Sequence, residues 1–198
     1  MERKFAITIA RQYGSGGLMI AERLSHILGI PFYDKALLQL ASKKSTLGES
    51  LFEKADEYKK FLAAELFENI FNTNPILDDS LFKIQSDVIK QIARKESAIF
   101  VGRCADYVLR EHFNCISIFI FANIEERVKR VSLRSNISHE KAEKLIYHTD
   151  KERAKYYNYY TQKIWGIAHS YNLCIDSSIL GIDETASFIR YFIEKKFK

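Results

Sequence analysis

The sequence has few of the residues that cross-link, break or anchor a chain. Its 198 residues include only three cysteines and two prolines. An odd number of cysteines without a C-x-x-C pair points away from a disulfide framework or a cysteine zinc site, so we expect the cysteines to be reduced. The longest apolar stretch, residues 115–122, is too short to cross a membrane, and residues 5–10 are too short for a secretion signal. We therefore expect a cytoplasmic protein with no membrane partner.

Apolar and basic residues, by contrast, are plentiful. Apolar residues make up 47% of the chain, which is enough for the core of a single domain spanning residues 1–198. The formal net charge is +5, and a basic balance of this kind suits an anionic partner.

Short apolar runs alternate with helical patterns along the chain. The runs that we interpret as strands are residues 5–10, 31–33, 98–101, 115–121 and 173–175. The segments with helical spacing are residues 20–28, 35–96, 124–134, 138–161 and 183–196. This alternation predicts an α/β fold with a five-stranded parallel sheet, helices on both of its faces and a helical insertion. Ligands of such sheets bind at the carboxyl ends of the strands, so the residues that follow each strand are the first candidates for a site.

Two of the predicted helices begin at recognisable capping residues. Ser138 is a suitable N-cap, with Glu140 in the first turn behind it. Asp79 or Ser80 could cap the last helix of the insertion. That helix is expected to turn four apolar side chains inward: Ile84, Val88, Ile89 and Ile92.

A glycine-rich turn, Gly14-Ser15-Gly16-Gly17, follows the first predicted strand. Glycines let backbone N–H groups approach an oxyanion closely, and the helix that follows directs the positive end of its dipole to the same place. A plain strand-to-helix turn would need only one glycine. The sequence therefore predicts a phosphate-binding loop.

A dinucleotide-binding motif is one alternative for this turn. Gly14 and Gly16 would then be the first glycines of G-x-G-x-x-G, and Asp34, about 20 residues further on, would be the ribose-binding acid. Met19, however, stands where the third glycine belongs. The long helical segment 35–96 also fits poorly in a compact dinucleotide-binding half.

A P-loop, G-x-x-x-x-G-K-[ST], is the other alternative. If Gly16 is its second glycine, Arg11 stands at the position of the first glycine. Gly17 and Leu18 then stand at the positions of the lysine and the hydroxyl residue. Neither motif is complete, so the turn alone leaves both alternatives open.

Arginines cluster at the positions expected for the ligand edge. Arg127, Arg130 and Arg134 are three and four residues apart, so they share one face of the helix that follows the fourth strand. The others follow strands or lie on the next helix: Arg11, Arg103 and Arg153, the last one turn after Asp150. Guanidinium groups that converge from separate segments suit a ligand with several negative charges, as in phosphoryl transfer. A solvated helix face is the alternative for the first three.

Aromatic and histidine residues indicate no further ligand. The tyrosines of "YYNYY" at 156–160 point in several directions on a helix, so we interpret them as core and cleft lining and expect no nucleic-acid partner. The histidines at positions 139, 148 and 169 share no metal-ligand spacing.

Taken in order, several blocks of the chain resemble the cytidylate kinase-like family, a branch of the P-loop nucleoside monophosphate kinases that carries GSGG in place of the lysine-containing loop. The blocks are "GSGG" at 14–17, "LGIPFYDK" at 28–35, "VGRCADYVLR" at 101–110, "ERVKRV" at 126–131, "DKERAKYYNYYTQKIW" at 150–165 and "YNLCIDSS" at 171–178. They extend over nearly the whole chain, and their order and spacing are more specific than any one of them.

The resemblance implies a three-layer P-loop NTPase fold, with a monophosphate-binding region at 35–96 and a lid at 132–140. It implies ATP and Mg²⁺ as cofactors and a small nucleotide as the partner. The residues implied in catalysis are Arg11, Arg103, Arg127, Arg130, Asp150 and Arg153. Those implied in binding the phosphate donor are Tyr13, Gly14, Ser15, Gly16, Gly17, Arg134, Asp176 and Ser177. Those implied in binding the acceptor are Asp34, Lys35, Asp106 and Tyr157.

Three hypotheses for the function follow. The first is phosphoryl transfer from ATP to a nucleoside monophosphate, cytidylate first among them, or to a similar small anion. In this hypothesis Arg11 supplies the charge of the missing lysine, Arg127 and Arg130 complete the clamp, and Asp34 holds Mg²⁺ through water. The second is a non-catalytic nucleotide-binding or sensor protein with a kinase fold, which Gly17 and Leu18 favour. The third is a dinucleotide-binding oxidoreductase domain.

Overall fold

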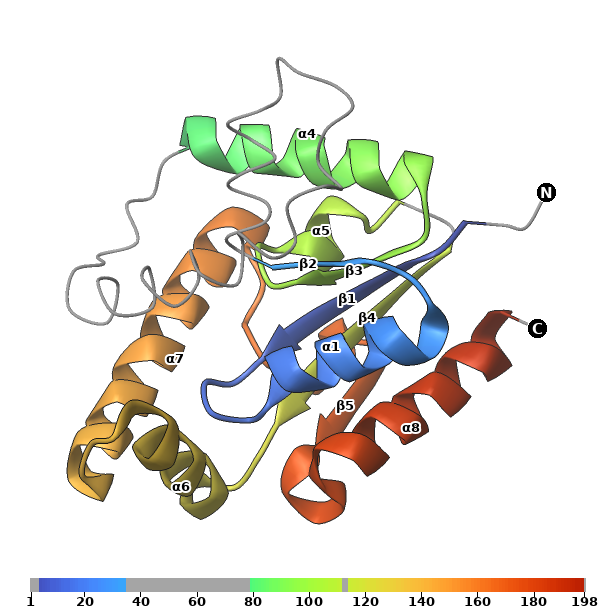
Figure 1. Ribbon diagram of the computed structural model, residues 1–198. Helices are drawn as coiled ribbons and strands as arrows, with labels where there is room; N and C mark the ends of the chain where they lie inside the picture. The colour runs from blue at the N-terminus through green and yellow to red at the C-terminus, as the bar shows by residue number, and fades with distance from the viewer. Residues whose placement is uncertain (1–3, 35–78, 112–113, 198) are drawn as a thin grey trace.

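A five-stranded parallel sheet forms the centre of the protein (Figure 1), whose computed structural model describes residues 4–34, 79–111 and 114–197. The strands are β1 (Ala6–Arg11), β2 (Phe32–Tyr33), β3 (Ala98–Val101), β4 (Cys115–Phe121) and β5 (Leu173–Asp176). Their order is β2-β3-β1-β4-β5, and every neighbouring pair is parallel. The predicted sheet is therefore confirmed, with β1 continuing one residue beyond the expected end, through Arg11.

Helices cover both faces of the sheet. They are α1 (Gly17–Leu28), α4 (Asp79–Lys95), α5 (Ala105–Val108), α6 (Ile124–Ser135), α7 (His139–Thr161), the short 3-10 helix η1 (Ala168–Ser170) and α8 (Ser177–Phe197). Figure 1 shows α1 and α8 side by side on one face and α4 and α5 on the other, while α6 and α7 stand beyond the end to which the strand arrows point. No helix in the described ranges is long and apolar enough to cross a membrane.

Alternating side chains of the central strands divide the core into two layers. Ile7 and Ile9 face α1 and α8, whereas Ala6 faces α4 and α5. Neighbouring strands keep the same alternation, with Ile99 in the first layer and Phe100 in the second. Because both faces are buried, the strands read in the sequence as nearly continuous apolar runs.

Most helix boundaries agree with the sequence. Ser138 caps α7, since its hydroxyl accepts the N–H of Lys141 at 3.3 Å, and the helix ends at Thr161 as expected. The last helix begins earlier than predicted, at Ser177, because a first helical turn precedes a kink at Gly181, whose φ is 71°. The short helix α5 was not expected, because four residues are too few to show a period.

One predicted core position in α4 is wrong. Ile84 is 43% exposed, whereas Val88 and Ile89 are buried. The buried stripe of α4 passes instead through Gln85 and Ser86, and these polar residues concealed it from a pattern based on apolar spacing. Residues 35–78 of the predicted helical insertion lie outside the described residues.

The strand order places the glycine turn at the topological switch point. β1 is flanked by β3 on one side and β4 on the other, so the chain leaves β1 where the order of strands reverses. Ligands of open α/β sheets bind in the crevice at such a point. The order also rules out the dinucleotide-binding alternative, in which the first strand would pair with the second rather than with the third.

Candidate active site

The loop from β1 to α1 is shaped by two glycines in the left-handed region. Gly14 has a φ of 81° and Gly16 a φ of 79°. A Cβ on Gly14 would lie 2.9 Å from Cγ2 of Val131, and a Cβ on Gly16 would collide with Ile182. The loop is therefore pressed between α6 and the start of α8. The first N–H groups of α1 have no acceptor inside the helix, and so they are available to an anion held by the loop.

Two serines hold this loop in place from the inside. The hydroxyl of Ser15 donates to the carbonyl of Gln12 at 2.9 Å. The hydroxyl of Ser177, which is fully buried at the junction of β5 and α8, donates to the carbonyl of Ser15 at 2.6 Å and lies 3.1 Å from the carbonyl of Phe121. Ser177 was expected to bind the phosphate donor, and the structure uses its hydroxyl to support the loop backbone. The neighbouring Asp176 accepts the N–H of Ser178 at 2.9 Å.

The predicted row of arginines on α6 points at the loop. Nε of Arg127 donates to the carbonyl of Tyr13 at 2.8 Å, and Nη1 of Arg130 donates to the carbonyl of Gly14. Nη2 of Arg134 donates to the hydroxyl of Tyr13 at 2.7 Å, and its guanidinium lies 5.1 Å from the centre of that ring. The alternative of a solvated helix face is therefore wrong for this row, although Arg134 itself is exposed.

Asp150 of α7 connects the loop to the arginines. Its Oδ1 accepts the N–H of Tyr13 at 2.7 Å, and its Oδ2 forms an ion pair with Nη2 of Arg127. Nη1 of Arg153 lies 3.8 Å from Oδ1. Burial raises the pKa of the Asp150 carboxyl, although the N–H of Tyr13 and the guanidinium of Arg127 both favour its charged form. The carboxylate therefore depends on these donors for its charge.

Arg11 and Arg153 bring further positive charge to the same place. Nη1 of Arg153 donates to the carbonyl of Arg11 at 2.9 Å. Burial, with the nearby guanidinium groups of Arg153 and Arg103, lowers the pKa of Arg11 well below its ordinary value, and Asp34 and Asp150 oppose this shift. Burial likewise lowers the pKa of Arg153 to about 10, so it remains charged at neutral pH. Buried cations that repel one another are stabilised by an anion.

Arg103 lies in a turn with three successive residues in the left-handed region. The φ angles are 77° at Gly102, 57° at Arg103 and 54° at Cys104. Left-handed residues other than glycine are strained by about 1–3 kcal/mol each and are concentrated at functional sites. The N–H of Gly102 donates to the carbonyl of Ile9 at 3.0 Å, which attaches the turn to β1. The turn sets the Arg103 guanidinium 5.4 Å from the centre of the Tyr156 ring.

Aromatic rings link α4 to α7 next to Arg103. Phe82 of α4 stacks on Tyr160 with ring centres 3.9 Å apart and meets Tyr156 edge-on at 6.3 Å. The sequence indicated tyrosines in this helix but could not tell which of them would lie beside Arg103, and so the contact between Arg103 and Tyr156 was not predicted.

The predicted acceptor residues fall into different environments. The hydroxyl of Tyr157 donates to Oδ2 of Asp106 at 2.7 Å, and burial raises the pKa of both groups. Tyr157 is 4% exposed, so its hydroxyl serves Asp106 rather than an open cleft. Asp34 is buried at the end of β2, within electrostatic range of Arg11. Lys35 lies outside the described residues.

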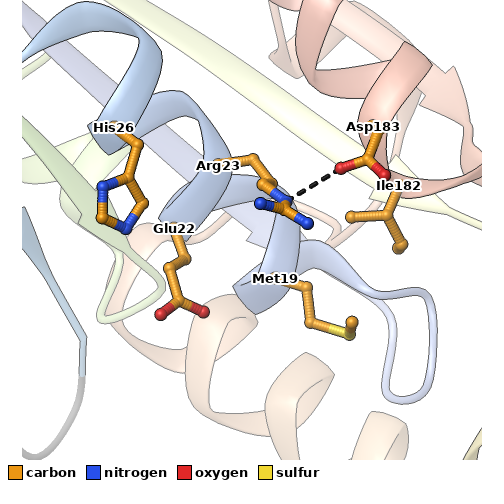
Figure 2. Close-up of a pocket in the computed structure, with 6 residues that line it drawn as sticks. All are labelled: Met19, Glu22, Arg23, His26, Ile182 and Asp183. Carbon is orange, nitrogen blue, oxygen red and sulfur yellow. Dashed lines mark ion pairs between the residues drawn. The ribbon is translucent and has the colours of Figure 1, made fainter.

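A separate groove lies between α1 and α8. It is lined by Met19, Glu22, Arg23, His26, Ile182 and Asp183. Figure 2 shows the ion pair that crosses it, with Nε of Arg23 2.8 Å from Oδ1 of Asp183. The groove contains acidic and basic side chains, and Arg23 and Asp183 neutralise each other. It therefore lacks the excess of positive charge that surrounds the glycine loop.

Comparison with known proteins agrees with this geometry. A sequence model described as the cytidylate kinase-like family matches residues 6–179. The cytidylate kinase of Methanopyrus kandleri is 26% identical over 200 residues, which cover 95% of this chain and 92% of that protein. The cytidylate kinase of Pyrobaculum neutrophilum is 25% identical, with 90% and 86% covered.

Solved structures show the same fold. An uncharacterized protein from Eubacterium ventriosum has a TM-score of 0.77 at 27% identity, with 96% of this chain and 99% of that chain covered. Shikimate kinase from Bacteroides thetaiotaomicron has a TM-score of 0.56 at 12% identity, with 96% and 98% covered. The five-stranded sheet with flanking helices is thus a P-loop kinase fold.

Proposed function

The chain belongs to the cytidylate kinase-like family, and from this membership we propose that it transfers the γ-phosphoryl group of ATP to a nucleoside monophosphate, with cytidylate the first candidate. The observation that carries the proposal is the convergence of arginines from three elements on one glycine loop. Arg127 and Arg130 from α6 and Arg153 from α7 each donate a hydrogen bond to a backbone carbonyl within residues 11–14, and Arg11 at the end of β1 begins this segment. A triphosphate is the ligand whose charge matches such a cluster.

The residues divide the reaction between positioning and charge neutralisation. The loop amides and the dipole of α1 hold the donor phosphates. Arg130 and Arg153 neutralise the charge of the transferred group. Asp150 fixes the position of Arg127 relative to the loop, because it binds both Arg127 and the N–H of Tyr13. Phosphoryl transfer needs no covalent intermediate, so a positioned acceptor oxygen in line with the leaving group is sufficient.

The remaining residues belong to the acceptor, the metal ion and the lid. Arg103 and Tyr156 contact the acceptor nucleotide from the strained turn and from α7. Asp34, which is buried at the end of β2, would hold Mg²⁺ through water, since Mg²⁺ is usually bound by few carboxylates together with substrate phosphates. When bound, the ion would neutralise phosphate charge. Residues 132–140, the junction of α6 and α7, form the lid, and Arg134 reaches from it to Tyr13.

The second candidate is a nucleotide sensor with the same fold. Gly17 and Leu18 favour it, because neither side chain can do what a P-loop lysine and hydroxyl do. Such a protein would bind ATP at the same loop and would not turn it over.

One set of measurements separates these candidates. ADP formation is followed with ATP, Mg²⁺ and a panel of nucleoside monophosphates, and ATP affinity is measured by titration calorimetry. We expect turnover with at least one acceptor, while tight ATP binding without turnover would identify the sensor. Arg130→Ala should lower kcat at least about a hundredfold. Its matched control is Lys129→Ala, an exposed cation one position earlier on α6, which should leave kcat unchanged. A protein that binds no ATP would refute both candidates.

A further inference from the structure

Arg11 and Gly17 stand at the two ends of the glycine loop. Arg11 is the last residue of β1, and Gly17 is the first residue of α1. With Gly16 as the second glycine of a P-loop, the motif expects its first glycine at position 11 and its lysine at position 17. The chain has a cation where the motif has a glycine, and a glycine where the motif has a cation.

The side chain of Arg11 occupies the space that a side chain at position 17 would need. A Cβ on Gly17 would lie 2.6 Å from Cβ and 2.8 Å from Cγ of Arg11. These atoms are next to the backbone and cannot swing aside as the end of a side chain can. Unlike Gly14 and Gly16, Gly17 is not in the left-handed region, so its backbone conformation does not call for glycine. The stem of Arg11 therefore leaves no room for a side chain at position 17.

The far end of Arg11 reaches the neighbouring strand. Its Nη1 lies against Gly102, where a Cβ would collide with it. The side chain thus crosses from the loop to the end of β3 along two residues that lack side chains. There it meets the charges of Arg103, Arg153 and Asp34. This is the space between the loop and the strained turn, at the carboxyl ends of β1 and β3, where ligands of open α/β sheets bind.

We propose that the cation and the glycine of the loop have exchanged places. Arg11 provides from the end of β1 the charge on the donor phosphates that a P-loop lysine provides from the start of the helix, and Gly17 leaves the room that Arg11 requires. The ligand part of this proposal rests on the proposed function, whereas the steric part is independent of any ligand.

The steric part is tested by the sign of a stability change. Alanine is favoured over glycine in a helix, so Gly17→Ala would raise the melting temperature if space allowed. We expect it to lower the melting temperature in the parent and to raise it in an Arg11→Gly background, where the clashing stem is gone. An increase, or no change, in the parent would overturn the proposal.

The ligand part is tested by restoring the glycine of the P-loop motif at position 11 and its lysine at position 17. We measure ATP affinity by titration calorimetry and check by circular dichroism that each variant is folded. Arg11→Gly should weaken ATP binding about 10–100-fold, the equivalent of one hydrogen bond to a charged group. The exchange variant Arg11→Gly/Gly17→Lys, which restores G-x-x-x-x-G-K, should regain most of this loss, while Gly17→Lys alone should not bind better than the parent.

Each outcome bears on one part of the proposal. Arg23→Ala, which removes an exposed arginine from the groove side of α1, serves as the control and should bind ATP as the parent does. Unchanged binding by Arg11→Gly, or no recovery in the exchange variant, would overturn the exchange. If the parent itself does not bind ATP, the proposed function fails together with the ligand part, and the melting temperatures still decide the steric part.

Discussion

Replacing Asp150 with asparagine tests whether this carboxylate connects the glycine loop to α6, the helix that carries Arg127. Its Oδ1 accepts the N–H of Tyr13 at 2.7 Å, and its Oδ2 pairs with Arg127. The side chains of Asp150 and Arg127 are only 16% and 8% exposed, so water cannot replace a lost partner. Removing one partner of a buried ion pair destabilises a protein by about 3–5 kcal/mol, because the other charge stays buried. The asparagine oxygen can still accept from Tyr13, so we expect a loss of about 3 kcal/mol, at the lower end of this range.

Urea unfolding followed by circular dichroism measures this loss. With a slope of about 2.5 kcal/mol per molar urea, the midpoint should fall by about 1 M. Asp150→Ala should fall further, by about 1 kcal/mol, because the N–H of Tyr13 then loses its acceptor as well. The control is Glu140→Gln, which breaks a 2.6 Å pair with Lys144 in which both side chains are 76% exposed, and should change stability by less than about 0.5 kcal/mol. If Asp150→Asn shifts the midpoint no more than this control, the reasoning is refuted.

Three further variants test other buried polar groups by the same unfolding assay. Ser177→Ala removes the 2.6 Å hydrogen bond to the carbonyl of Ser15, and should lower stability by about 1–2 kcal/mol. No change would mean that this hydrogen bond does not stabilise the loop. Gln85→Met should raise stability by about 1 kcal/mol, because Gln85 is 1% exposed and neither polar atom of its amide has a partner within the described ranges; a loss would reveal a partner. Burial raises the pKa of Asp106 in the folded protein above its pKa in the unfolded chain. Between these two pKa values the folded protein keeps a proton that the unfolded chain has released. Stability therefore falls as the pH rises through this range. Asp106→Asn should therefore gain stability relative to the parent as the pH rises above about 4, the unfolded value, and a difference that stays constant or shrinks there would contradict this assignment.

Periodicity and position along the strands predicted much of the architecture. The five strands and the long helices follow from apolar patterns that local physics dictates, and the row at Arg127, Arg130 and Arg134 follows from helical spacing. The order of the strands and the partners of each side chain depend on contacts between distant segments. Arg153 and the carbonyl of Arg11, for example, are 142 positions apart, and no pattern in the sequence announces their hydrogen bond.

Individual misses have specific physical causes. Gln85 concealed the buried stripe of α4 because a buried amide resembles a surface residue in the sequence, and Ile84 was placed inward in its stead. For Ser177, the sequence predicted a place at the donor site, which stays a prediction, and could not show that its hydroxyl donates to the carbonyl of Ser15. A residue after a strand can face either the ligand or the loop that holds it, and only the three-dimensional packing decides between them.

Helix α7 is the longest helix in the part of the chain that the structure describes. Its 23 residues form a rod of about 35 Å, since each residue of a helix adds about 1.5 Å. The N-terminal end joins residues 132–140, the C-terminal part carries Tyr156 and Tyr160 against α4, and Asp150 is fastened to the loop near the middle. Because Asp150 attaches the middle of α7 to the loop, a tilt of the helix about this point would move its two ends in opposite directions. Under the proposed function, closure over the donor and contact with the acceptor would then be parts of one movement.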